Sequence, residues 1–265
     1  SMEWCANGPV RQGIKTKFKV GESEIEQKIF LAHNNKRLDF ETRVNWKERH
    51  KMLRVGFDVN IRSQFASYEI QYGYLQRPTH RNTSWDMAKF EGVAHKFVDL
   101  SDQEYGVALL NDCKYGHKVL DNRMEINLLR SPTNPDPEAD RGLHSFTYSF
   151  VPHTGDLVNS NVFSQAAQLN RPPALFNGFA GNGFELPFSL SDENVILEVI
   201  KKAEREDATI VRLYESRGRA VSTKLKINSR FNQAFETDLL EQNPAEIKIV
   251  DGEVCLEFNP FEIKT

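Results

Sequence analysis

The chain has 265 residues, and its 34 Lys and Arg against 37 Asp and Glu give a formal net charge of −3. This near balance favours neither nucleic acid nor a membrane surface as a partner. No apolar run approaches the ~18 residues that a membrane helix needs, and we expect no signal peptide at the start. Three widely spaced cysteines without a CxxC pair indicate neither a disulfide framework nor a cysteine zinc site, and they favour a cytoplasmic location: Cys5, Cys113 and Cys255.

Alternating apolar and polar residues predict strands along most of the chain, because successive strand side chains point to opposite faces of a sheet. In Ile14–Val20, apolar residues and a threonine alternate with three lysines until Gly21 ends the run. Asn34-Asn35 suits a turn, since Asn tolerates a positive φ. Further strands are predicted at Ile25–Phe30, Leu38–Val44, Leu53–Val59, Tyr68–Tyr72, near Lys89–Val93, Val107–Leu110, Met124–Leu128 and Phe146–Phe150.

A single helix interrupts the strands. Apolar residues recur at helical spacing over Asp156–Asn170, and Pro172 and Pro173 follow as a stop. The next stretch, Asn170–Ser189, is rich in Asn, Gly and Pro and reads as a connection between two domains. Beyond it, strands are predicted at Val195–Ile200, Ile210–Tyr214, Val221–Ile227, Phe235–Leu239, Ile247–Val250 and Val254–Phe258.

These elements predict an all-β fold in two domains. Frequent strands separated by turn residues favour a large antiparallel β-sandwich with one short helix over residues 1–190. Residues 191–265 form a smaller unit that resembles an immunoglobulin-like sandwich. Asp251-Gly252 predicts a tight hairpin in that unit, because type I′ turns need two residues with positive φ.

Polar residues are concentrated in the turns of the central stretch Tyr105–Phe150. Paired carboxylates could serve glycoside hydrolysis, and Asp112, Asp136 and Asp140 are candidates by residue type. They could equally cap turns or form salt bridges with arginines. A calcium loop in the same stretch is not predicted, since Arg141 and Thr147 stand where an EF-hand needs Gly and Glu.

Four scattered histidines lack HxH or HExxH spacing. They could form a zinc site with Asp112 or Asp140 only if the fold gathers them, and loop or surface positions are the simpler interpretation. No GxSxG motif or Gly-rich phosphate loop is present. The histidines are His80, His95, His117 and His144.

Several ordered segments resemble the C-terminal region of glycoside hydrolase family 38 α-mannosidases, most of all the cytoplasmic branch. The resemblance covers most of residues 40–170 and weakens after residue 190. It is carried by Asn45–Leu53, Tyr68–Gly73, Arg77–His80, Asn82–Asp86, Phe90-Glu91, Tyr105–Gly116, Leu128–Pro132, Pro135-Asp136, Asp140, Gly142, His144, Phe146, Tyr148, Gln168–Asn170 and Val211–Glu215.

The resemblance implies a galactose-mutarotase-like supersandwich followed by a small terminal β-domain, both without catalytic machinery. In the family, the nucleophilic aspartate and the zinc ligands lie in an N-terminal β/α barrel that this sequence lacks, where a retaining two-carboxylate mechanism proceeds. We therefore expect zinc only in that missing domain and none in this chain. The implied partners are the N-terminal catalytic domains and a mannose-containing oligosaccharide, and a homo-oligomer remains open.

The resemblance also implies that one loop of the large sandwich supplies an arginine to the substrate. Arg130 matches that position best, and its guanidinium could bind sugar hydroxyls. The loop from Arg130 to Asp140 is longer than in secretory members, and a plain Arg130–Asp140 pair that holds the loop is the alternative. His144 is a weaker candidate than Arg130 for a functional role. The expected substrate-binding residues are Arg130, Asp112, Lys114, Tyr115, Asp136 and Asp140.

Two functional hypotheses follow. In the first, the chain is the non-catalytic C-terminal part of a cytoplasmic α-mannosidase, inactive alone, with an apolar face bare where the barrel would pack. In the second, it is a free-standing carbohydrate-binding sandwich that stacks sugars on Trp85, Tyr115 or Trp46.

Overall fold

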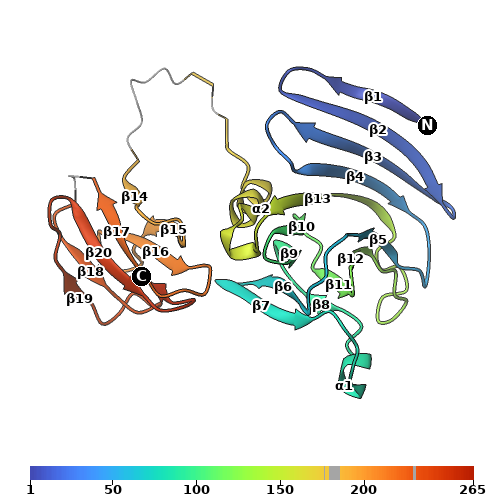
Figure 1. Cartoon of the computed structure of the whole chain (residues 1–265). Helices are drawn as coiled ribbons and strands as arrows, with labels where there is room; N and C mark the ends of the chain where they lie inside the picture. Colours follow the sequence, from blue (N-terminus) through green and yellow to red (C-terminus); the bar gives the residue numbers. More distant parts are fainter. Residues whose placement is uncertain (176, 179–185, 229–230) are drawn as a thin grey trace. The chain divides into compact units, whose positions relative to one another are not determined.

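The computed structural model describes residues 1–175, 177–178, 186–228 and 231–265 (Figure 1). The chain forms two compact units: Ser1–Ile70 with Leu75–Ala174, and Gln71–Tyr74 with Leu175–Thr265. The predicted connection Asn170–Ser189 lies partly outside the described residues, and the predicted boundary after residue 190 stays a prediction. No described helix has the length and apolar character required to cross a membrane.

Two antiparallel sheets build the first unit. The larger has nine strands in the order β1-β2-β3-β4-β13-β10-β9-β6-β7, and the smaller has four in the order β5-β12-β11-β8. The strands are β1 Met2–Asn7, β2 Arg11–Val20, β3 Ser23–Ala32, β4 Leu38–Trp46, β5 Leu53–Asp58, β6 Phe65–Ile70, β7 Gly73–Pro78, β8 Gly92–Val93, β9 Phe97–Ser101, β10 Tyr105–Asn111, β11 Gly116–Leu120, β12 Arg123–Leu129 and β13 Gly142–Thr154.

The core of the first unit lies between these sheets. The apolar side of β12 packs against β4 and β13, where Ile126 and Leu128 meet Phe40 and Tyr148. The rings of Phe40 and Tyr148 stack with centroids 4.8 Å apart. Alternation in the sequence therefore selects the inner face of each strand, and burial of that face drives the sandwich together.

Helical structure is short. The predicted helix Asp156–Asn170 is in fact a 3-10 turn, Leu157–Asn159, followed by α2, Val162–Asn170. Phe163 of α2 meets Phe97 of β9 edge to face at 5.4 Å. The sequence did not predict α1, Ser84–Met87, which forms one turn within the polar loop after β7.

The second unit is a small antiparallel sandwich. Its sheets have the orders β14-β17-β20, β15-β16-β21 and β18-β19, and apolar side chains of the two three-stranded sheets share one core. The strands are β14 Phe188–Leu190, β15 Val195–Lys202, β16 Thr209–Glu215, β17 Val221–Ile227, β18 Ala234–Glu236, β19 Ala245–Ile247, β20 Glu253–Phe258 and β21 Ile263–Lys264.

The all-β sandwich fold is confirmed, and differences are local. The turn Asp251-Gly252 has positive φ at both residues, as the hairpin signal requires. The predicted strand Tyr68–Tyr72 is too long, because Tyr72 has φ +60 and forms a turn. The prediction Ile247–Val250 is wrong in position, since β19 ends at Ile247 and Val250 forms only a bridge to Glu253. Strands β1, β7, β9, β11, β14 and β21 were not predicted.

The buried thioether of Met124 gives a stability test. Met124 is 0% exposed between the sheets, whereas Met87 of α1 is 64% exposed. Met124→Ala should lower the free energy of unfolding by about 2–5 kcal/mol, because it leaves a cavity. Met87→Ala is the matched control and should change it by less than about 0.5 kcal/mol. Urea denaturation measures both, and equal losses would contradict the described core.

Candidate functional site

The turn after β10 is fixed by its own polar side chains. Buried Asn111 accepts a hydrogen bond from the Lys114 N–H at 2.7 Å and donates to the His95 carbonyl at 2.8 Å. The Asp112 carboxylate accepts from the Thr147 N–H at 2.9 Å. The turn is thereby attached to β13, and its other side chains have defined directions.

Lys114 and Tyr115 leave this turn toward different neighbours. The Lys114 ammonium lies 4.7 Å from the centroid of the Phe146 ring, in a cation–π contact. The exposed Tyr115 ring packs instead against the His95 ring, with centroids 5.0 Å apart. Lys114 therefore belongs to the β13 side of the turn.

The loop between β12 and β13 is closed by Asp140. Its Oδ2 accepts hydrogen bonds from the N–H groups of Arg130 at 2.9 Å and Ser131 at 3.0 Å. Partial burial acts to raise the pKa of Asp140, but these two donors, together with the nearby charges of His144 and Lys114, outweigh it and lower the pKa. His144 donates from Nε2 to the Asp140 carbonyl at 2.8 Å. Asp140 is thus an ionised clamp on the loop.

The Arg130 side chain is left free by this arrangement. Asp140 binds the backbone of Arg130, so the two residues do hold the loop but not through a side-chain ion pair. The guanidinium is exposed, and no described residue forms a hydrogen bond or ion pair with it. A guanidinium without a protein partner can donate several hydrogen bonds to a polar molecule.

Asp136 lies apart from this group. It is exposed, and its carboxylate accepts only a local hydrogen bond from the Glu138 N–H at 2.9 Å. Glu138 in turn pairs with Arg49 and Arg141. Asp112 and Lys114 therefore contact the first half of β13, and Asp140 closes the loop that leads into it from Arg130. Asp136 makes only its local contact, and Tyr115 packs against His95.

The aromatic residues of the second hypothesis differ sharply in exposure. Trp46 is 1% exposed and donates its indole N–H to the Ser131 hydroxyl, so it is a core residue that cannot stack on a sugar. Proposing it for stacking was wrong. Trp85 of α1 is 79% exposed, and Tyr115 is partly exposed against His95.

The four candidate histidines are not gathered. His117 is fully buried, and this burial lowers its pKa to about 3, so it stays neutral. Among the described residues, no three His, Cys, Asp or Glu side chains come together as metal ligands. The histidine–aspartate zinc site considered from the sequence is therefore absent from the part of the chain that the structure describes.

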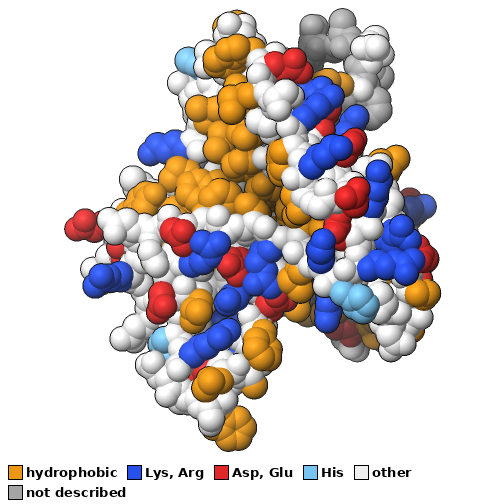
Figure 2. Space-filling view, turned by 90° about the vertical axis from the view of Figure 1, so that its right-hand side faces the viewer, with side chains coloured by type: hydrophobic (Ala, Val, Ile, Leu, Met, Phe, Trp, Pro, Cys, Tyr) orange, Lys and Arg blue, Asp and Glu red, His pale blue; other side chains and the backbone are white. Residues whose placement is uncertain are grey.

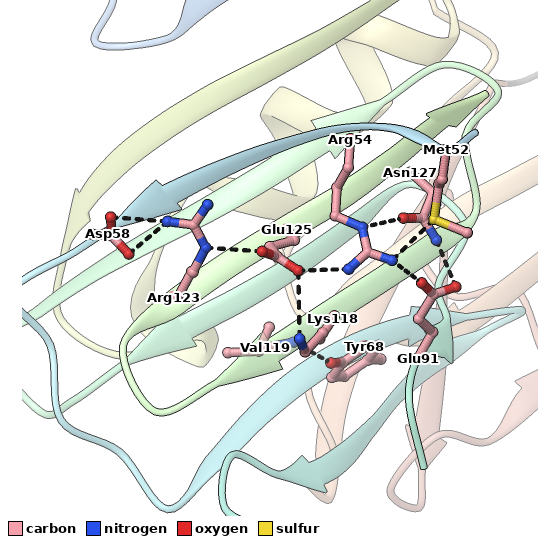
Figure 3. Close-up of polar contacts among 10 residues, drawn as sticks. All are labelled: Met52, Arg54, Asp58, Tyr68, Glu91, Lys118, Val119, Arg123, Glu125 and Asn127. Atoms are coloured by element: carbon pink, nitrogen blue, oxygen red, sulfur yellow. Dashed lines mark hydrogen bonds and ion pairs between the residues drawn. The ribbon is translucent and has the colours of Figure 1, made fainter. Parts of the chain in front are cut away.

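Sequence reasoning missed a charged network on the outer face of the four-stranded sheet (Figure 3). Arg123, Glu125 and Asn127 project from β12 on the side opposite its core residues. Glu125 accepts from Arg54 and Arg123 at 2.8 Å each, while Arg54 and Asn127 both bind Glu91. The alternation of Met124–Leu129 carried the signal, since its polar members had to share one face.

Asp140→Asn should destabilise the chain by about 1 kcal/mol near neutral pH, a value reduced for solvent exposure. An aspartate with a lowered folded-state pKa stabilises above its unfolded pKa of about 3.9, and the effect is lost as the pH falls through the folded value. The difference from the unmodified chain in urea denaturation should thus shrink below about pH 4. Asp136→Asn is the control, and a difference independent of pH would contradict the clamp.

The comparisons with known proteins agree with the resemblance seen in the sequence. Residues 1–138 match the family description "Glycosyl hydrolases family 38 C-terminal domain", and residues 194–265 match "Glycosyl hydrolases family 38 C-terminal beta sandwich domain". Alpha-mannosidase G of Dictyostelium discoideum is 42% identical over 98% of this chain and 25% of its own length. Alpha-mannosidase 2C1 of Homo sapiens is 40% identical over 91% of this chain and 24% of its own length.

Solved structures show the same fold. The crystal structure of an alpha-mannosidase from Enterococcus faecalis V583 superposes with a TM-score of 0.84 at 18% identity, over 100% of this chain and 34% of that one. The present chain thus spans about a quarter of the length of the curated relatives it matches. It belongs to glycosyl hydrolase family 38, and it corresponds to the C-terminal region of that family.

Proposed function

We propose that this chain is the non-catalytic C-terminal part of a retaining α-mannosidase that hydrolyses terminal α-D-mannosides. In this role it supports a catalytic barrel and contributes the Arg130 loop to the rim of the active site. The observation that carries the proposal is the pair of family matches, together with the quarter share of the relatives' length. The relatives named as α-mannosidases supply the activity of the whole enzyme.

The use of the carboxylates supports a non-catalytic role. Asp112, Asp136 and Asp140 each accept a hydrogen bond from a backbone N–H. Asp136 thereby caps a local turn, as considered from the sequence, while Asp112 joins its turn to β13 and Asp140 closes its loop. A retaining glycosidase needs two carboxyl groups facing each other across the scissile bond. In our proposal both come from the barrel, which also holds the zinc.

An uncovered sheet face supports contact with further domains. Strands β1–β3 extend the inner face of the large sheet: Trp4 pairs with Ile14, and Ile14 with Ile29, in register with core residue Phe40. Trp4 is 67% exposed, and Phe18 and Leu31 on the same face are also exposed. Hydrophobic side chains gather in the upper half of the face in Figure 2, on the side of these strands. Such a patch is typical of an interface.

The rim role of Arg130 rests on its free guanidinium. Asp140 fixes the backbone at Arg130 and Ser131, so the side chain starts from a rigid base. Lys114 lies on the same side of the molecule, close enough to affect the pKa of Asp140. Neutral sugar hydroxyls accept hydrogen bonds from such groups, and this motivates mannose-containing oligosaccharides as the ligand.

A cytoplasmic location is part of the same proposal. Cys5, Cys113 and Cys255 are all free thiols in the structure. Free, exposed cysteines are typical of reducing compartments.

The alternative is a free-standing carbohydrate-binding module. The exposed indole of Trp85 is the observation that favours it, since aromatic rings can pack against sugar faces. Isothermal titration of the chain with mannose oligosaccharides tests this, because the heat of binding is measured without Trp85 as the reporter. Saturable binding that Trp85→Ala abolishes and Arg130→Ala leaves intact would favour the module.

Kinetics on a chromogenic α-mannoside test the main proposal. We expect turnover by the full-length enzyme and none by this chain alone, with or without zinc. Arg130→Ala in the full-length enzyme should lower kcat/KM by about 10- to 100-fold, the value of one or more charged hydrogen bonds. Arg43→Ala, an exposed arginine on β4, is the control. Turnover by the chain alone would overturn the non-catalytic role.

The uncovered face predicts dye binding. The chain alone should bind a hydrophobic fluorescent dye or self-associate, and Trp4→Lys with Phe18→Lys should reduce the signal severalfold, because two apolar side chains leave the patch. Leu143→Lys is the control, since Leu143 is an exposed apolar residue on the opposite face of β13. An equal reduction by the control would contradict a single docking face.

A further inference from the structure

A pocket of about 240 Å³ lies in the first unit, beside the long loop that follows β7. Its wall combines Tyr68 of β6, Gln76–Pro78 at the end of β7, residues of the loop that follows up to Gly92 of β8, and Lys118–Leu120 of β11. The volume holds several water molecules, at roughly 30 Å³ each. None of the pocket residues belongs to the Arg130 loop, so the site goes beyond the proposed function.

The loop that forms part of the wall is held by hydrogen bonds at its start and in its middle. Thr79 donates its hydroxyl to the Ser63 carbonyl at 2.6 Å, and its own carbonyl accepts from the Asp121 N–H at 2.7 Å. Farther along, Thr83 and Asp86 form a reciprocal capping box at the start of α1. The pocket is thus preformed rather than assembled from loose chain.

Arg77 is held in this wall without an anionic partner. Its guanidinium carbon lies 5.3 Å from the centroid of the Tyr68 ring. Its Nε is buried and has no hydrogen-bond partner. A Cβ on Gly92 would lie 3.1 Å from that Nε, so the absence of a side chain at Gly92 makes room for it. Holding a partly buried cation with an unpaired N–H is unfavourable unless an acceptor arrives.

The other charges of the wall are already paired. Lys118 lies 3.7 Å from Glu125, and Lys89 lies 3.5 Å from Asp86. Glu91 is bound by Arg54 and Asn127 (Figure 3). The wall carries four Lys and Arg against two carboxylates, and both carboxylates have partners. The remaining cations are therefore Arg77 and Arg81.

Two further side chains of the wall have nitrogen donors that could bind an acceptor in the pocket. The guanidinium carbon of Arg81 lies 5.9 Å from the centroid of the Phe90 ring, and Arg81 forms no ion pair with any described residue. His80 also lines the pocket, and its buried Nδ1 has no partner. Guanidinium groups match oxyanions through parallel N–H donors. An uncharged ligand would leave the excess positive charge of the wall uncompensated.

We propose that this pocket binds a small oxyanion, a phosphate or a carboxylate group, between Arg77 and Arg81. The guanidinium of Arg77 is preorganised by Tyr68 and Gly92, and Arg81 approaches from the loop. Phosphate and carboxylate groups both offer anionic oxygen atoms that accept hydrogen bonds. The probe that binds shows which of the two groups the pocket takes.

Isothermal titration of the whole chain with inorganic phosphate, and separately with acetate, tests the proposal at constant ionic strength set with sodium chloride. We expect saturable one-to-one binding of at least one anion. Binding of phosphate alone identifies a phosphoryl ligand, and binding of acetate as well extends the class to carboxylates. Chloride serves as the reference for unspecific screening.

Three variants locate the binding. Arg77→Gln should weaken it at least about tenfold, the loss expected for a charged hydrogen-bonded pair. Gly92→Ala keeps every charge but fills the space beside Arg77, and it should weaken binding similarly. Arg43→Gln removes a positive charge elsewhere on the same unit and should leave the affinity within about twofold.

No saturable binding of either anion to the unmodified chain overturns the proposal. So does a loss for Arg43→Gln as large as that for Arg77→Gln, because it would reflect net charge alone. Circular dichroism verifies that each variant is folded. Should Arg77→Gln fail to fold, the exposed variant Arg81→Gln decides in its place, and unchanged affinity there contradicts the assignment.

Discussion

The first unit depends on the alternation of β12. Its inward side chains, Met124, Ile126 and Leu128, fill the space between the two sheets, and burial of that apolar surface is the main force that holds them together. Its outward side chains form the paired charges of Figure 3. One strand therefore supplies the core on one side and a rigid polar surface on the other.

Both functional proposals use that rigidity. The Arg130 loop begins directly after β12 and returns into β13, and the Asp140 carboxylate closes it. The oxyanion pocket lies beside the neighbouring strand β11, next to the network that already neutralises Lys118 and Glu91. In each case the framework pairs most charges and leaves a guanidinium unpaired, and unpaired guanidinium groups are what a polar ligand can use.

The alternation of apolar and polar residues made most of the strands predictable. Features that depend on contacts between distant parts of the chain could not be predicted. Strand β9 was missed because it is buried on both faces, with Asp99 paired to buried His153, and so shows no alternation. The residues near Arg130 could be predicted by type and chain order. The sequence could not show that Asp140 binds the backbone of Arg130 rather than its guanidinium. Trp46 did carry a local signal, because it continues the alternation of Phe40 and Val44 onto the inner face of β4, whereas exposed Trp85 follows no such pattern. The oxyanion pocket joins residues of β6, β7, β11 and the loop after β7, which only the folded chain brings together.

In our proposal, this chain packs against further domains through the inner face of β1–β3 and the Arg130 loop. Hydrogen–deuterium exchange, compared between the chain alone and the full-length enzyme, tests it most directly. We expect slower exchange in the full-length enzyme over residues 2–32 and 130–142, with β17 and β20 in the terminal sandwich unchanged. Equal exchange of residues 2–32 and 130–142 in both proteins would contradict the claim.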